Sequence, residues 1–320
     1  MISSRIILII LVMTLALLNL GVAAQTSSSI EPTNYSLGDR WEYLVNGQLA
    51  NLAGFSGFPA TIQIRGPVAA EVASTEGEST TLSWRGDLTL EGALSIPFVE
   101  GSPEAELSGG IALSREEQYE VPYFLPLSIQ STADFSIQIT NFCPPAECSA
   151  SLELLANQTP GASFPIYPLE EGDREVVILS QVQTRVSFSF DGFRLENVSA
   201  MELESVLLMN VTAGHHVDVP AGSFQALKVT THVAEGMAFG FFQELFPGTR
   251  QVAYYSNEVG NAVLFQFFSN DTEVGNITLQ SYYIGSARPI WQHPVLIGGL
   301  LAVPAAILLY LSWRERRKGL

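Results

Sequence analysis

The stretch "VDVPAGSFQALKV", residues 217–229, shows how this chain folds back on itself. Apolar residues alternate with Asp218 before the turn, as they do on a strand with one buried face. Pro220 has the φ angle that the second position of a type I turn requires, Ala221 can follow it, and Gly222 can adopt a left-handed conformation. These features predict a three-residue hairpin loop, Pro220, Ala221 and Gly222, between two antiparallel strands.

The same alternation recurs along most of the chain, for example in "TIQIR" (61–65), "DFSIQIT" (134–140) and "RVSFSF" (185–190). Clusters of Gly, Pro, Asn and Ser separate such runs at short intervals. The sequence therefore predicts an all-β region over 37–284, built as a curved antiparallel sheet of half-barrel or sandwich-like form, in one domain or two. Only "MAFGFFQELF" (237–246) is ambiguous between a short helix and an apolar strand.

The N-terminus has the pattern of a secretion signal. Arg5 precedes an apolar run that ends at Leu18, and small residues follow up to Ala24. A charged start, a short apolar segment and a small-residue site are typical of a cleaved signal peptide. We expect a signal peptide over 1–24, with an uncleaved anchor as the alternative, and a flexible start over 25–36.

The C-terminus has the pattern of a membrane anchor. Residues 294–313 contain no charged side chain, and twenty residues of helix span the hydrocarbon core. The basic segment 314–320 follows at once, which places it on the cytoplasmic side. We therefore expect a linker at 285–293, one transmembrane helix at 294–313, a cytoplasmic tail, and a large domain outside the cell.

The charge of the expected outer part is strongly negative. The whole chain has 15 Lys and Arg against 32 Asp and Glu, and 10 against 31 remain when Arg5 and the tail are set aside, a net charge of −21. Such a surface repels phosphate backbones, so we expect no nucleic-acid partner.

Two further sequence features agree with export. Cys143 and Cys148 lie close together in "NFCPPAECS", which predicts a local disulfide outside the cell. Six Asn-x-Ser/Thr sequons predict N-glycosylation; they lie at Asn34, Asn157, Asn197, Asn210, Asn270 and Asn276.

No motif for catalysis, phosphate binding or calcium binding is found in the sequence, and we expect no cofactor and no enzymatic activity. His216 and Asp218 share one face of a predicted strand and could form a metal or acid–base pair, although such pairs are more often solvated. The pairs Glu116-Glu117 and Glu170-Glu171 are interpreted as solvated charge.

Four segments resemble a group of uncharacterised prokaryotic exported proteins: "VPAGSFQALKV" (219–229), "VAYYSNEVGNAVLF" (252–265), "LGDRWEYLVNG" (37–47) and "PLEEGDREVVIL" (168–179). Members of that group resemble half-barrel lipoprotein carriers, so the resemblance implies a curved antiparallel sheet with an apolar concave face. It implies no catalytic residue. The disulfide, the sequons and the anchor are not part of the shared pattern.

Three functions are compatible with these features. The first is a cell-surface binding or interaction domain, with an apolar ligand as one option; the second is a structural component of a cell-envelope or secretion complex; the third is an enzyme with a dispersed site. Aromatic residues on strands supply either a filled core or a groove for an apolar chain. They are Phe188, Phe190, Phe265, Phe267 and Phe268.

Overall fold

The computed structural model describes residues 29–30, 35–50, 60–94, 105–120, 125–140, 148–160, 169–190, 193–235, 246 and 249–285. Every regular element in this part of the chain is a strand, which confirms the all-β prediction. The strands are β1 (Ser29–Ile30), β2 (Arg40–Ala50), β3 (Ala60–Glu76), β4 (Ser79–Leu94), β5 (Ala105–Glu120), β6 (Leu125–Thr140), β7 (Cys148–Pro160), β8 (Leu169–Glu170), β9 (Gly172–Phe190), β10 (Phe193–Val219), β11 (Gly222–Glu235), β12 (Arg250–Ser256), β13 (Asn261–Ser269) and β14 (Thr272–Tyr283).

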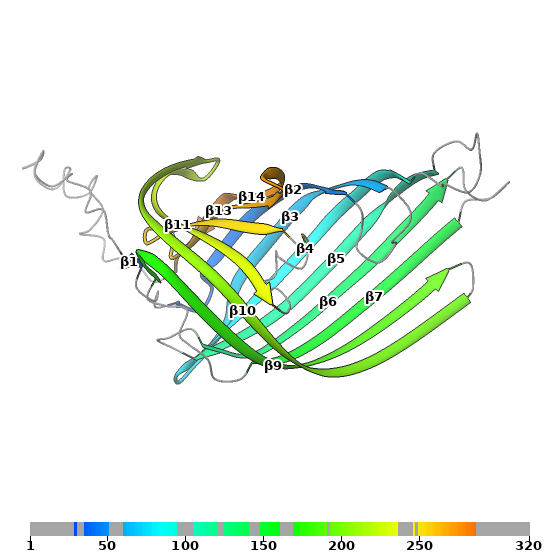
Figure 1. Ribbon diagram of the computed structural model, residues 1–320, viewed down its shortest axis with the longest axis horizontal. Helices are drawn as coiled ribbons and strands as arrows, with labels where there is room; N and C mark the ends of the chain where they lie inside the picture. Colours follow the sequence, from blue (N-terminus) through cyan, green and yellow to red (C-terminus); the bar gives the residue numbers. More distant parts are fainter. Residues whose placement is uncertain are drawn as a thin grey trace, which may run out of the picture.

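The strands form one large antiparallel sheet, in the order β10-β11-β12-β13-β14-β2-β3-β4-β5-β6-β7-β9. Most neighbours in the sheet are also neighbours in sequence, whereas β14 returns to pair with β2 (Figure 1). The short strands β1 and β8 pair separately. Ser29 and Ile30 are therefore paired, whereas the sequence predicted a flexible start over 25–36.

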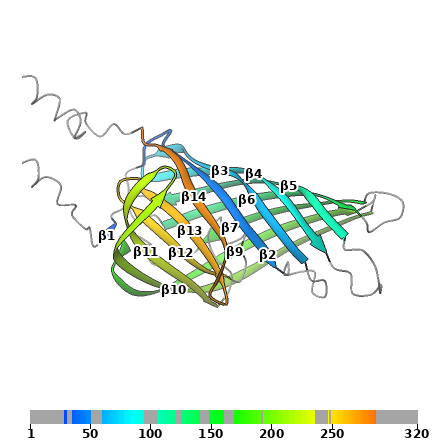
Figure 2. The ribbon, with the colours of Figure 1, turned by 90° about the horizontal axis from the view of Figure 1, so that it is seen from above.

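The long strand β10 joins the two ends of this order. One of its sides pairs with β9 along residues 193–211, and the other side pairs with β11 only from Val206 onward. The contact between β11 and β12 is short and covers residues 227–231 of β11. Because β10 pairs with both β9 and β11, the two ends of the strand order meet near the short strands β11–β14. The sheet stays open where β9 and β10 project away from these strands (Figures 1 and 2).

The hairpin at 217–229 is the corner between β10 and β11. Val219 pairs directly with Gly222, so the loop contains two residues, Pro220 and Ala221, and not the three that we predicted. Gly222 has a φ angle of +142° and starts the return strand. The backbone N–H of Ala221 donates to the carbonyl of Leu279 at 3.3 Å, which ties the tip of the hairpin to β14.

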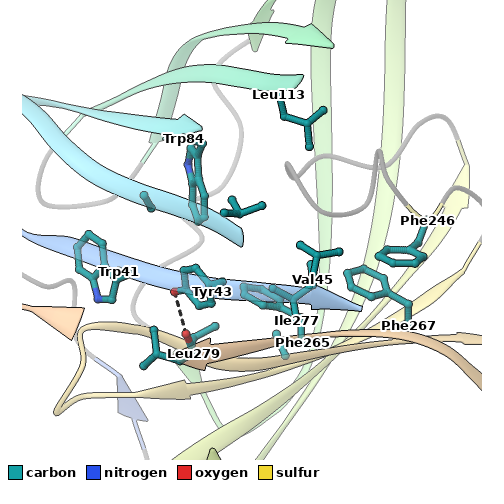
Figure 3. Packing of buried hydrophobic residues seen from close by; sticks show 14 of the residues in the cluster. Trp41, Tyr43, Val45, Trp84, Leu113, Phe246, Phe265, Phe267, Ile277 and Leu279 are labelled. Atoms are coloured by element: carbon teal, nitrogen blue, oxygen red, sulfur yellow. Dashed lines mark hydrogen bonds between the residues drawn. The ribbon is translucent and has the colours of Figure 1, made fainter. Parts of the chain in front are cut away.

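The apolar core lies on one face of the sheet and extends over β2–β5 and β12–β14 (Figure 3). On β2 the side chains of Trp41 and Tyr43 are almost fully buried. The indole N–H of Trp41 donates to the carbonyl of Val259, and the phenol of Tyr43 donates to the carbonyl of Ala262, each at 3.0 Å. Because these aromatic groups bury their polar atoms with a partner, they pack as core and not as the lining of a cavity.

Phe246 fills a notch made by two glycines. It is the only residue of the ambiguous segment 237–246 that the structure describes, and it is buried with its ring stacked on Phe267 at 4.4 Å between centroids (Figure 3). Gly47 and Gly275 are register partners below this ring. A Cβ atom on either glycine would overlap the ring of Phe246. The two glycines therefore let the sheet approach Phe246 closely.

The expected signal peptide at 1–24, the transmembrane helix at 294–313 and the basic tail at 314–320 lie outside the described residues. Within the part of the chain that is described, no helix is long and apolar enough to cross a membrane.

Candidate functional site on the inner face of the sheet

We call the face of the sheet that carries the core the inner face. Alternation along β5 places Ile111, Leu113, Arg115 and Glu117 on this face, and all four are buried. The register carries the inner face across β6 and β7 to β9 and β10. Rows of register-paired residues therefore lead from the core to the open side of the sheet.

One apolar row shows how burial changes across the sheet. It begins at Leu88 and Ile111, passes through Phe135, and reaches Leu195 on β10 through the register partners 152 and 188. Leu88 and Ile111 are 2% and 3% exposed, whereas Leu195 is 55% exposed. The same face thus changes from core to solvent-facing surface along a single row.

A second row repeats this change. Ile129 on β6 and Val182 on β9 are buried, but Met201, which pairs with Val182, is 46% exposed. By alternation, the exposed side chains of Leu179 and Val198 project from the outer face, where isolated apolar residues are common. Leu195 and Met201 differ from these two residues because they lie on the inner face. Each belongs to a row of register partners whose members on other strands are buried.

A buried ionic cluster includes Glu117, the register partner of Ile129 in the second row. Its other members are Trp84, Arg115, Tyr119 and Ser131. The Nε of Arg115 is 2.6 Å from Oε1 of Glu117, and both side chains are almost fully buried. Oε2 of Glu117 accepts from the indole N–H of Trp84 at 3.0 Å and from the phenol of Tyr119 at 2.7 Å. Nη1 of Arg115 reaches the hydroxyl of Ser131 at 3.5 Å.

This cluster corrects our interpretation of Glu116-Glu117 as solvated charge. Glu116 is exposed, but Glu117 is buried, because alternation turns it to the inner face together with Arg115, two residues earlier. Glu170 and Glu171 are exposed, in line with the prediction for that pair.

Tyr119 and Tyr255, two partly buried tyrosines near this cluster, remain protonated over a wide pH range. Burial raises the pKa of Tyr255 to about 12, and the negative charge of Glu117 adds to the effect. Burial, followed by the charge of Glu117, also raises the pKa of Tyr119, while Arg115 partly opposes this shift. The phenol of Tyr119 is a hydrogen-bond donor and not a base, and the carboxylate of Glu117 already accepts from three groups. The cluster is therefore built to hold strands together and not for proton transfer.

A polar row continues from the cluster toward the open side. Ser131 is the register partner of Arg115, and the row ends at Thr184 on β9 and Ser199 on β10. The hydroxyls of Thr184 and Ser199 are 2.6 Å apart. The exposed inner face consequently carries hydroxyl groups between the rows of Leu195 and Met201.

His216 and Asp218 lie on the same face of β10, as the sequence predicted. The Nε2 of His216 is 3.5 Å from Oδ1 of Asp218, and both side chains are exposed. His215 points elsewhere and contacts Thr212 and Tyr254. In the described ranges no three His, Cys, Asp or Glu side chains gather as a metal site would need. The pair is thus a solvated contact.

The predicted modification sites are placed only in part. Asn197, Asn210 and Asn270 are exposed, and Asn276 is half-buried with its side-chain amide donating to Glu273. Asn157 lies on β7, and Asn34 is outside the described residues. Cys148 begins β7, but Cys143 also lies outside, so the disulfide stays a prediction.

Comparison of the chain with protein-family models, with curated proteins and with solved structures finds no match. The resemblance to exported half-barrel proteins therefore stays a proposal.

Proposed function

We propose that this chain is a membrane-anchored, N-glycosylated domain on the cell surface that binds an apolar ligand on the exposed inner face of β9 and β10. The ligand is an extended apolar chain, such as the hydrocarbon part of a lipid. The domain acts by binding and not by catalysis.

The observation that carries this proposal is the change in burial along the row from Ile111 to Leu195. Ile111 is 3% exposed and Leu195 is 55% exposed, although the register places them on one face. Surfaces of this kind, apolar and next to a rigid core, are common at ligand sites. The neighbouring hydroxyls of Thr184 and Ser199 offer polar contacts beside the apolar rows.

The sequence supports the cellular setting. A signal peptide at 1–24 and a stop-transfer segment at 294–313 with basic residues behind it would hold the domain outside and close to a membrane. Exposed sequon residues, including Asn210 and Asn270, agree with glycosylation on that side. The half-barrel form implied by the resemblance fits a sheet with one open side and an apolar inner face.

The test uses two leucines of equal exposure on opposite faces. Leu195 on the inner face is 55% exposed, and Leu179 on the outer face is 54% exposed. A soluble fragment ending before residue 294 is purified without detergent and examined by native mass spectrometry, and its folding is checked by thermal melting. We expect an apolar ligand to co-purify, to be lost in Leu195→Asp and to be kept in Leu179→Asp.

Two outcomes would reject the proposal: a ligand-free protein that also fails to bind fluorescent lipid probes, or equal loss of ligand in both variants. The alternative function is a structural component of a cell-envelope or secretion complex. It is favoured by one observation, the length of β10 that pairs with β9 on one side only. A ligand-free protein found in a stable envelope assembly would support that alternative.

A further inference from the structure

The first half of β10 forms an open edge of the sheet. Residues 193–204 pair with β9 on one side, while the ladder with β11 on the other side begins only at Val206. No strand covers this edge in the part of the chain that the structure describes. A strand edge with unpaired N–H and C=O groups is a template for pairing with a further strand.

This edge also lacks several usual means of protection. Edge strands commonly carry Lys, Pro or a bulge that prevents pairing with other molecules. Residues 193–204 contain neither Lys nor Pro, and their ladder with β9 runs without a register shift. Their charged residues are Arg194, Glu196, Glu202 and Glu204. Two of their apolar side chains, Leu195 and Met201, are exposed on the inner face.

We propose that two copies of this chain associate through this edge, β10 against β10, in antiparallel orientation about a two-fold axis at Val198. The two sheets would then form one continuous sheet across the dimer. This inference concerns assembly and does not depend on the ligand proposed above.

Charge selects the register. With the axis at Val198, Arg194 lies opposite the partner's Glu202, and Leu195 lies opposite the partner's Met201. Arg194 and Glu202 are both exposed, and neither has an ion-pair partner among the described residues. A shift of the axis to Ser199 would keep one kind of opposite-charge pair, Arg194 with the partner's Glu204. It would also place Glu196 opposite the partner's Glu202, and like charges in that position are unfavourable.

The sequon at Asn197 is compatible with this arrangement. Side chains of a strand project above and below the sheet and not along its hydrogen-bonding edge. A glycan on Asn197 would therefore leave the backbone groups of the edge accessible.

A single cysteine at the axis tests the inference on the full chain in membranes. In a hydrogen-bonded antiparallel pair the two Cα atoms lie about 5.5 Å apart, which is within the range of a disulfide. We expect Val198→Cys to give a covalent dimer on non-reducing gels under mild oxidation. The control is Arg85→Cys, an exposed position on β4, which should stay monomeric. A monomer in both variants, or equal dimer in both, would overturn the proposal.

Charge reversal gives a second readout that does not require a new cysteine. In Arg194→Glu, two like-charge pairs replace two opposite-charge pairs, and we expect the dimer dissociation constant to rise about tenfold or more. The double variant Arg194→Glu/Glu202→Arg restores opposite charges and should restore the dimer. Arg85→Glu makes the same change in charge away from the edge and should have no effect. Failure of the double variant to recover would contradict the register.

Discussion

The buried ion pair between Arg115 and Glu117 permits a quantitative test of the fold. In Glu117→Gln the side chain keeps an oxygen for the N–H of Trp84 and the phenol of Tyr119. The negative charge is lost, and an amide NH2 replaces the oxygen that accepts from Nε of Arg115. The guanidinium of Arg115, which is 1% exposed, then loses the carboxylate that lies 2.6 Å from its Nε. The variant therefore removes the ion pair together with its hydrogen bond, while the contacts to Trp84 and Tyr119 can stay.

Removal of one partner from a buried ion pair typically costs about 3–5 kcal/mol, because the remaining charge stays desolvated. We expect Glu117→Gln to lower the free energy of unfolding by about that amount. The double variant Arg115→Met/Glu117→Gln removes the stranded charge, so it should be more stable than Glu117→Gln alone. Adding Arg115→Met to the Glu117→Gln variant should thus stabilise it, although most substitutions in a core are destabilising.

Urea unfolding followed by tryptophan fluorescence measures these free energies. The matched control is Glu42→Gln, since Arg40 and Glu42 form an ion pair with the same two-residue spacing on a strand but with half-exposed side chains. We expect a loss of less than about 1 kcal/mol there. A loss of similar size at Glu117 and Glu42, or a double variant less stable than Glu117→Gln, would refute the reasoning.

Four further predictions can be tested directly. Gly47→Ala should lower the free energy of unfolding by about 1–3 kcal/mol because its Cβ overlaps Phe246, and Phe246→Leu should relieve part of this loss in the double variant. Gly222→Val should lower the melting temperature because a β-branched residue is strained at φ +142°; an unchanged melting temperature would contradict this. The raised pKa of Tyr255, about 12 against 10 for an exposed phenol, stabilises the fold fully below pH 10 and progressively less as the pH rises through 12, so phenolate absorbance should appear together with unfolding. Protease added to intact cells should remove the domain and leave a tag on the C-terminal tail intact; digestion of the tag would refute the proposed orientation.

The sequence was sufficient to predict the all-β antiparallel class and the hairpin corner. Alternation identified runs such as 134–140 and 185–190, and both lie within strands. Pro220 and Gly222 located the turn, but the loop is one residue shorter than predicted. The predicted length assumed an isolated hairpin, whereas the N–H of Ala221 bonds to β14, a strand that lies far away in the sequence.

The ionic cluster was missed although the sequence contains a signal for it. Ile111 and Leu113 begin an alternating series that Arg115, Glu117 and Tyr119 continue. Alternation with a period of two residues, continued from Leu113, places both Arg115 and Glu117 on the buried face, where they can form an ion pair. We instead treated Glu116-Glu117 as a unit, and neighbouring residues on a strand face opposite sides.

The open side of the inner face could not be predicted from alternation. Alternation assigns both Leu195 and Ile111 to the apolar face of a strand. Their exposure to solvent, however, depends on which strands lie opposite them. That in turn depends on long-range pairing, above all on how far the β11 ladder extends along β10. The notch for Phe246 has the same origin, because Gly47 and Gly275 meet only when β14 returns to β2.

The central claim, that the exposed inner face of β9 and β10 holds an apolar ligand, is tested most directly by photo-crosslinking in intact cells. A photoreactive side chain replaces Met201, which is 46% exposed on the inner face, or Leu179, which is 54% exposed on the outer face. After irradiation, the domain is recovered and its mass is measured. We predict a small apolar adduct from position 201 and none from position 179; the absence of an adduct at position 201, or equal adducts at both positions, would contradict the claim.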